Sequence, residues 1–295
     1  MAVTEHVNVP GGRYRLGDHF DEGYPADGES PTFEVAVEGF DIDATPVTNA
    51  QFGAFVEATG HQTDAERYGD SAVFHLAVAA RPEDVVGRSG AAPWWLRVRG
   101  ADWRHPYGPT SGIDDLAEHP VVHVSWADAR AYAGWAGCSL PTEAQWEVAA
   151  RGGLVGARFA WGDELTPGGR WMCNIWQGRF PTRNTAEDGW LATSPVATYP
   201  PNGYGLYDVA GNVWEWCEDV FRAARPDQGA RVDDGGRRHL GLADDGVTAA
   251  PLRRVTRGGS YLCHDSYCHR YRVAARTGNT PDSTAGNCGF RTVGR

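Results

Sequence analysis

The sequence predicts one domain of turns, irregular segments and short helices and strands, packed around aromatic anchors. Glycine and proline are frequent, with 38 and 18 residues, and both favour turns. Twelve tryptophans among 295 residues supply large side chains for a core, and 41% of the residues are hydrophobic. No Ser/Pro/Gly-rich linker or charge block divides the chain, so we expect a single domain over residues 1–295.

Composition and charge exclude several classes of protein. The net charge of −11 argues against nucleic-acid binding, which needs a basic face. No segment approaches the ~20 consecutive apolar residues of a membrane-spanning helix, and the N-terminus has no apolar leader. Six cysteines in a chain of this length are not a disulfide framework. We therefore expect a cytoplasmic protein with no nucleic-acid or membrane partner. The cysteines expected to be buried or inert thiols are Cys138, Cys173, Cys217 and Cys288.

The first 42 residues contain the patterns of short strands. Residues 7–18 combine an apolar stretch, a Pro-Gly-Gly turn and alternation through Tyr14 and Leu16, which predicts a hairpin. Residues 33–42 alternate again, and we expect them to pair with that hairpin.

Capping boxes predict three helices. In this pattern an N-cap side chain and the side chain three positions later each accept a hydrogen bond from the other residue's backbone N–H. The three pairs are Thr48 with Gln51, Ser125 with Asp128, and Thr142 with Gln145. The first helix should end at Gly60 and the third at Gly152, because glycine adopts the left-handed conformation that ends helices.

The remaining segments have weaker patterns. Residues 67–111 show no clear period, and we interpret them as long ordered loops held in place by tryptophans such as Trp94, Trp95 and Trp103. Residues 119–126 predict a short strand that leads into the second helix. Beyond residue 153 we expect turns, short strands and ligand-binding loops.

Two thiols near the C-terminus are the first chemical signal. Cys263 and Cys268 form a C-x4-C pattern in a segment rich in Tyr, His and Arg. The spacing alone fits a disulfide, half of a zinc site or two unrelated core cysteines. Thiolates are soft ligands that also select Cu(I), and two of them on one short loop can hold this ion and leave one side open. A structural zinc site needs four ligands, and no second close cysteine pair supplies them.

The segment around these thiols resembles the catalytic signature of the formylglycine-generating enzymes, the sulfatase-modifying factor family, of the prokaryotic type. The motifs GGSY, C-H-x-S-Y-C, RYR-x-AAR, NTPDS and N-x-GFR follow one another between residues 258 and 291. Further segments similar to the family are APWWL, HPVVHVSW, LPTEAQWE, NIWQG and GNVWEW. The resemblance therefore covers nearly the whole chain. It implies a single compact α+β domain, related to the C-type-lectin architecture and low in regular secondary structure.

The resemblance also implies a reaction and the residues that perform it. The activity is the O2-consuming, copper-dependent oxidation of a cysteine, within a C-x-P-x-R motif of a sulfatase or peptide, to Cα-formylglycine. Cu(I) maps onto Cys263 and Cys268, and the active-site hydroxyls onto Ser260 and Tyr267. The oxygen-pocket asparagine maps onto Asn287, and Trp214 resembles the tryptophan near the metal. We expect the Trp94/Trp95 segment to form part of the substrate groove.

Two oxygen-rich segments are candidate calcium sites. Calcium prefers carboxylate and carbonyl oxygens. By the resemblance, two structural Ca2+ ions map onto two sets of residues, Asn174, Ile175, Asp188 and Trp190 for one ion, and Asp208, Gly211, Val213 and Glu215 for the other. From the residues alone, Asp and Asn in ordinary turns remain the alternative.

Three other functions compete with copper-dependent oxidation. A metal-free thiol/disulfide oxidase would use a redox disulfide between Cys263 and Cys268 on the same substrate. A non-enzymatic, lectin-like binding module could share the fold, although such paralogues lose the thiol pair. A sulfoxide synthase with non-haem iron would need an additional helical domain with three histidine ligands, for which the chain has no room.

Overall fold

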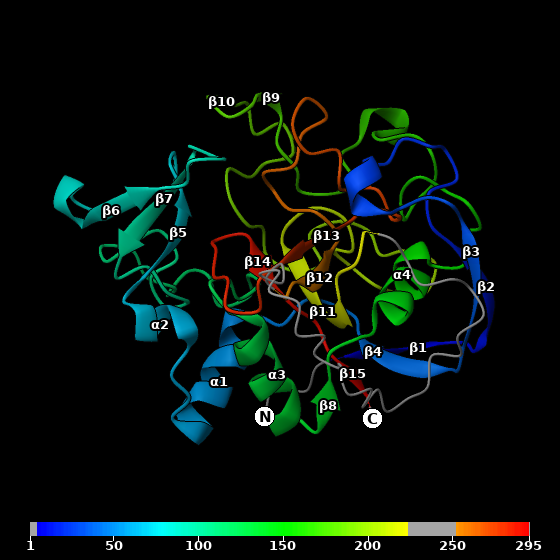
Figure 1. The fold of residues 1–295 in the computed structure, drawn as a ribbon, viewed down its shortest axis with the longest axis horizontal. Helices are drawn as coiled ribbons and strands as arrows, with labels where there is room; N and C mark the ends of the chain where they lie inside the picture. Colours follow the sequence, from blue (N-terminus) through cyan, green and yellow to red (C-terminus); the bar gives the residue numbers. More distant parts are fainter. Residues whose placement is uncertain (1–4, 224–251, 295) are drawn as a thin grey trace, which may run out of the picture.

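The computed structural model describes residues 5–223 and 252–294. Short helices and strands joined by long connections make up this part of the chain (Figure 1). The helices are α1 (Asn49–Thr59), α2 (Asp64–Tyr68), α3 (Trp126–Trp135) and α4 (Glu143–Arg151). The strands are β1 (His6–Val9), β2 (Gly12–Leu16), β3 (Phe33–Val37), β4 (Phe40–Asp43), β5 (Asp70–Phe74), β6 (Val85–Arg88), β7 (Trp95–Arg99), β8 (Cys138–Ser139), β9 (Gly178–Arg179), β10 (Arg183–Asn184), β11 (Trp214–Val220), β12 (Arg254–Arg257), β13 (Arg276–Asn279), β14 (Cys288–Gly289) and β15 (Val293–Gly294).

The predicted capping boxes open α1, α3 and α4. At each of the three N-termini the side chain accepts the N3 backbone N–H, and the N3 side chain accepts the N-cap backbone N–H. Gly60 and Gly152 end α1 and α4 in the left-handed conformation, as expected. A fourth capping box, Thr63 with Glu66, opens α2, which the sequence analysis did not identify. Local hydrogen bonding therefore fixes where these helices begin.

The strand pairing differs from the predicted N-terminal hairpin. β1 pairs with β4, and β2 pairs with β3, so the two strands on either side of the Pro-Gly-Gly turn do not pair with each other. The expected pairing of residues 33–42 with the first strands is confirmed. The prediction failed because alternation marks a strand but does not select its partner.

Two further predictions were wrong. Residues 67–111 contain the antiparallel β5–β7–β6 sheet rather than loops alone. This sheet buries Val73 and Val98, and Figure 1 shows it on the side of the molecule away from β2 and β3. Residues 119–126 form no strand, because Pro120 makes only an isolated bridge to Thr48. Proline lacks the backbone N–H that a longer ladder would need.

Two four-stranded sheets bring distant parts of the chain together. The order β1-β4-β15-β8 inserts β15 between β4 and β8. The order β13-β12-β11-β14 places β11 at the centre, antiparallel to β12 and parallel to β14. Figure 1 shows this second sheet in the middle of the molecule, with α4 beside it. The segment between β12 and β13 carries both thiols, so this sheet positions the candidate site.

The core is aromatic, as the tryptophan content predicted. Its largest cluster contains Phe52, Tyr132 and Phe290 in mutual ring contact, and it extends to Cys263 and Cys268. Charged residues are also fully buried, each in an ion pair. Arg257 binds Glu147 at 2.8 Å and Arg291 binds Glu215 at 2.7 Å. All six cysteines are buried free thiols, which confirms the expectation for the four outside the C-x4-C pair.

Candidate active site

The thiol loop, residues 258–272, begins at a double glycine directly after β12. Gly258 and Gly259 have φ angles of 89° and 74°, which lie in the left-handed region. A Cβ atom on Gly259 would lie 2.7 Å from the carbonyl oxygen of Arg270, so only glycine fits there. This close approach lets the two ends of the thiol loop pack against each other and turns Ser260 into the core.

The two sulfur atoms of the loop converge. A turn from Ser260 to Cys263 and a hydrogen bond from the Cys268 N–H to the His264 carbonyl fold the loop onto itself. Cys263 Sγ and Cys268 Sγ lie 3.0 Å apart, and the two residues are 1% and 7% exposed. The Ser260 N–H points at Cys263 Sγ from 3.4 Å. The structure therefore brings together the two thiols that the sequence analysis singled out.

The two thiols differ in acidity. A hydrogen bond from Cys263, together with the nearby Arg270 guanidinium, lowers the pKa of Cys268 to about 7. Burial raises the pKa of Cys263 well above its ordinary value, and the hydrogen bond with Cys268 adds to this rise. Cys268 is therefore the thiol of the pair that ionises first, and its ionisation begins near neutral pH.

The predicted oxygen-pocket residues lie beside the thiols. Asn287 Nδ2 donates to Ser260 Oγ at 3.0 Å, and the Trp214 N–H donates to the Asn287 carbonyl at 2.9 Å. β11 pairs with β14 through Trp214 and Cys288, which holds these groups in one layer. Trp214 is buried in the same core cluster as Cys263 and Cys268. Asn287 is thus bound to Ser260, whose backbone N–H contacts Cys263 Sγ, and the apolar core cluster surrounds this group.

Tyr267 forms the solvent-facing edge of the site and is 40% exposed. Its ring stacks on Phe180 with centroids 4.3 Å apart and meets the edge of Trp94 at 4.7 Å. Burial and the two thiols raise the pKa of Tyr267 to about 12, so its phenol stays protonated at neutral pH. Trp94 therefore lies against Tyr267, whereas Trp95 packs against Phe74.

The first candidate calcium set converges. Asp188 accepts hydrogen bonds from the N–H groups of Ile175 and Trp190, at 3.1 and 3.0 Å. Asn174 Nδ2 donates to the Ala192 carbonyl, whereas Asn174 Oδ1 is buried without a hydrogen-bond partner among the described residues. Burial raises the pKa of Asp188. The buried, unpaired amide oxygen of Asn174 and the half-buried carboxylate of Asp188, which is bound to the adjacent Ile175, suit a hard cation.

The second candidate calcium set fits a cation only in part. Asp208 is buried, and burial raises its pKa to about 6. Glu215, however, already accepts two hydrogen bonds from Arg291 and one from the Trp146 indole. Gly211 and Val213 lie between Asp208 and Glu215 in the sequence. The N–H of Asn212, in the same segment, donates a hydrogen bond to the Asn174 carbonyl. Asp208 and the backbone carbonyls remain suitable oxygen donors, while Glu215 is shared with an arginine.

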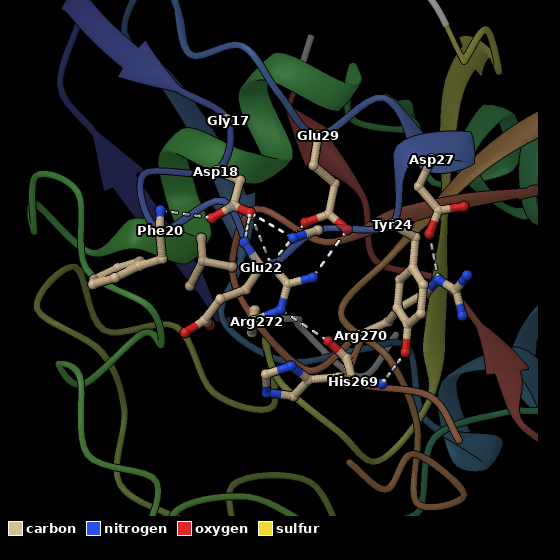
Figure 2. Close-up of polar contacts among 12 residues, drawn as sticks. Gly17, Asp18, Phe20, Glu22, Tyr24, Asp27, Glu29, His269, Arg270 and Arg272 are labelled. Atoms are coloured by element: carbon tan, nitrogen blue, oxygen red, sulfur yellow. Dashed lines mark hydrogen bonds and ion pairs between the residues drawn. The ribbon is translucent and has the colours of Figure 1, made fainter. Parts of the chain in front are cut away.

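Residues 17–29 form a second segment of the site, which no sequence motif predicted. Figure 2 shows acidic and aromatic side chains of this segment in contact with residues 269–272. Glu29 forms two hydrogen bonds with Arg272, at 2.8 and 3.0 Å, and Asp27 binds Arg270 at 2.5 Å. The local density of arginines was visible in the sequence, but no pattern linked it to residues some 240 positions away.

The fold and the site together define a class of protein. A mixed α+β fold with few helices surrounds two converging, buried thiols flanked by hydroxyl and amide groups, an arrangement suited to cysteine-based redox or soft-metal chemistry. The chain belongs to the formylglycine-generating-enzyme family: it matches the family described as "Sulfatase-modifying factor enzyme 1-like domain" over residues 1–295.

Individual relatives agree with this placement. The chain is 63% identical over 285 residues to the formylglycine-generating enzyme of Streptomyces coelicolor, covering 97% of this chain and 87% of that protein. It is also 44% identical over 289 residues to a Bos taurus protein named inactive C-alpha-formylglycine-generating enzyme 2, covering 97% of this chain and 86% of that protein. The chain thus belongs to a family of enzymes, some members of which are named inactive.

Solved structures support the same fold. PvdO from Pseudomonas aeruginosa superimposes with a TM-score of 0.66 at 23% identity, covering 98% of this chain and 94% of that chain. At this level of identity the likeness shows the fold alone. The predicted class, a single compact α+β domain, is confirmed. In the described part of the chain, no helix is long and apolar enough to cross a membrane.

Proposed function

We propose that this protein oxidises a cysteine, within a C-x-P-x-R segment of a sulfatase, to Cα-formylglycine and consumes O2 in doing so. The observation that carries the proposal is the pair of buried sulfurs of Cys263 and Cys268, 3.0 Å apart beside Ser260 and Asn287. The family's name connects it to sulfatases. The retained thiol pair separates this chain from a degenerate binding module, which would have no use for two converging thiols in its core.

We propose Cu(I) as the cofactor, held by Cys263 and Cys268. Two buried sulfur donors 3.0 Å apart suit a soft monovalent ion better than a hard one. Among residues 5–223 and 252–294, no group of three or more His, Cys, Asp and Glu side chains could hold a metal, which argues against a three-histidine iron site. When bound, copper would supply the one-electron chemistry that activates O2, which protein side chains lack.

The chain's own residues would bind the substrate and organise the reaction. The aromatic cluster of the exposed Tyr267 and the partly buried Phe180 and Trp94 offers a docking face for an extended peptide next to the thiols. Ser260 and Asn287 would hydrogen-bond oxygen or the reacting sulfur. Tyr267 would donate a proton, because its phenol is protonated at neutral pH. Trp214 and its apolar neighbours would exclude bulk water.

The proposed reaction balances with an external thiol reductant. The substrate cysteine loses a β-hydrogen and its sulfur, and the β-carbon gains a carbonyl oxygen from water, which is a two-electron oxidation that releases hydrogen sulfide. Reduction of O2 to water takes four electrons, so the reductant supplies the other two. The peptide mass falls by about 18 Da, since –SH and one hydrogen are replaced by a carbonyl oxygen.

A specific observation keeps a metal-free thiol/disulfide oxidase as a second candidate. A separation of 3.0 Å between the sulfurs is only about 1 Å longer than a disulfide bond. Small side-chain movements would bring Cys263 and Cys268 to bonding distance, and O2 would take two electrons and two protons from them to give the disulfide and hydrogen peroxide. That disulfide could then accept the two electrons of the substrate cysteine and return to two thiols. Anaerobic addition of Cu(I), followed by ultraviolet thiolate-to-copper absorbance, separates the two schemes.

We also propose structural calcium at the two oxygen-rich sets. The set of Asn174, Ile175, Asp188 and Trp190 is the better supported, because Asn174 Oδ1 is buried without a partner in the described structure. The set of Asp208, Gly211, Val213 and Glu215 is supported by the buried carboxylate of Asp208. A cytoplasmic location is proposed from the six free thiols, which suit a reducing compartment.

Mass spectrometry of a C-x-P-x-R peptide tests the proposed function. The protein is incubated with the peptide, copper, a thiol reductant and air, and the expected result is a mass loss of about 18 Da at cysteine. Cys268→Ser should lower the rate at least ~100-fold, since it removes a direct ligand rather than an outer-shell group. Cys138→Ser, a buried thiol on β8 outside this site, is the matched control and should retain full activity. Full turnover by Cys268→Ser with added copper would overturn the copper proposal.

A further inference from the structure

Residues 17–29 clamp the outgoing end of the thiol loop (Figure 2). The Tyr24 hydroxyl accepts the His269 N–H at 3.1 Å, and Arg272 binds both Glu29 and the His269 carbonyl. Arg270 binds Asp27. Three consecutive contacts from one segment therefore fix the backbone directly after Cys268.

Arg270 connects this clamp to the sulfur. Its Nη1 lies 3.7 Å from Cys268 Sγ, within hydrogen-bonding distance for sulfur. Its Nε donates to Asp27 Oδ2 at 2.5 Å, and its guanidinium carbon lies 4.1 Å from the centre of the Tyr24 ring. The guanidinium is thus held by a carboxylate and an aromatic face while one N–H points at the thiol.

The backbone of Asp27 is fixed by a second arginine, Arg276. Arg276 donates to the Asp27 carbonyl at 2.7 Å, and the same guanidinium binds Glu143 on α4 at 2.6 and 2.8 Å. The following residue, Gly28, turns with φ of 67°, and a Cβ there would collide with the Ala223 carbonyl. The Asp27 side chain is only 8% exposed. The carboxylate that directs Arg270 is therefore a fixed part of the fold.

A two-thiolate complex with Cu(I) carries a net negative charge, and a substrate thiolate would add another. An anion in a buried site is costly unless a cation is nearby. Arg270 is the cationic side chain that the structure places on Cys268 Sγ, and its own side chain is 22% exposed. Without Asp27 this guanidinium could rotate towards solvent, since only the Tyr24 ring and the long contact to Cys268 Sγ would hold it.

We propose that Asp27 and Arg270 form a positioning pair that holds a fixed positive charge against the Cys268 sulfur and thereby stabilises the anionic two-sulfur complex with Cu(I). The inference rests on the proposed copper function. It assigns to residues 17–29 a role in the metal site, to which they contribute no ligand. Neither residue needs to touch the substrate.

Cu(I) affinity tests the pair directly. It is measured anaerobically by competition with a chromogenic Cu(I) chelator, and the thiolate-to-copper absorbance reports the two-sulfur geometry. Arg270→Gln should weaken Cu(I) binding about 10- to 100-fold, the range seen when groups just outside a ligand shell are removed. Asp27→Asn should weaken it about 3- to 10-fold, because the arginine remains but is less firmly directed. Arg270→Lys, which keeps the charge, should recover part of the loss.

Arg158→Gln is the matched control. Arg158 binds Glu22 of the same segment at 2.7 Å and lies over Phe20, but it is not placed on either sulfur. This variant should bind Cu(I) like the unsubstituted protein. Thermal unfolding checks that all variants are folded, and if Arg270→Gln does not fold, Asp27→Asn decides, since it keeps the shape of the side chain.

The outcomes separate the two proposals. Equal Cu(I) affinity in folded Arg270→Gln and Asp27→Asn proteins overturns the positioning pair and leaves the copper proposal intact. The same result follows if Arg158→Gln weakens binding as much as Arg270→Gln does, because the effect would then be unspecific. An unsubstituted protein without affinity for Cu(I) overturns the copper proposal and the positioning pair together.

Discussion

The thiol loop and the oxygen-rich loops, residues 174–190 and 208–215, differ in how their buried polar groups are paired. In the thiol loop, Arg270 and Arg272 are paired with carboxylates from residues 17–29. In the oxygen-rich loops, Asn174 Oδ1 has no partner among the described residues, and burial raises the pKa of both Asp188 and Asp208. The first region is therefore organised by the protein's own charges, whereas a cation would complete the second.

Removing one buried carboxylate should damage the first region most. Glu29→Gln leaves the buried Arg272 with only its longer ionic contact to Asp18, at 3.8 Å, and we expect a loss of up to about 3–5 kcal/mol in the free energy of unfolding. Chemical denaturation measures this loss. Glu34→Gln is the control, because the Arg13–Glu34 pair is 78% and 63% exposed and should be worth at most ~1 kcal/mol. Similar losses in the two variants would show that the clamp is not a special stabilising feature.

Calcium should stabilise the second region. At a concentration about 100 times its Kd, a bound ion adds about 2.7 kcal/mol to the free energy of unfolding. The midpoint of thermal unfolding should therefore rise with added calcium and fall with a chelator, and Asn174→Ala should reduce the response. Asn8→Ala, at an exposed Asn8–Asp41 contact, should respond like the unsubstituted protein. If neither calcium nor chelator changes the midpoint, the oxygen-rich loops do not depend on a cation, and the proposed difference between the two regions is wrong.

A third kind of buried polar group, the neutral side chain of His123, should make the stability of the protein depend on pH. His123 is fully buried between Ser71 and the Pro106 carbonyl, and burial lowers its pKa to about 4. The unfolded chain then binds the proton more readily than the folded protein between about pH 4 and 6.5. Stability from this residue is thus present above pH 6.5 and is lost as the pH falls towards 4, by about 1–3 kcal/mol.

Unfolding free energies measured across this pH range test the assignment. His123→Asn should flatten the pH dependence, since asparagine also tolerates the left-handed backbone at this position but does not titrate. The nearby Asp102 carboxylate and the Ser71–Thr284 hydrogen bond remain in both proteins. If the free energy of unfolding changes with pH in the same way in both proteins, groups other than His123 cause the pH dependence.

The sequence predicted what depends on near neighbours or on family motifs. Three capping boxes located helix starts, and the C-x4-C motif located two thiols that do converge. The fourth box, Thr63 with Glu66, carried the same signal and could have been found. The β5–β7–β6 sheet was missed because its strands are short and half-buried, so alternation is weak. Long-range partners such as Asp27 and Arg270 could not be found, because an ion pair leaves no periodic pattern.

The contacts that lock the thiol loop join residues 243 positions apart. During synthesis, residues 17–29 leave the ribosome long before Cys263 and Cys268 are made. Their contacts with the thiol loop can therefore form only late in synthesis. Closing so large a loop costs entropy and slows folding. Until it closes, both sulfurs are open to adventitious metals and oxidants, so newly made chains should be the most vulnerable to thiol damage.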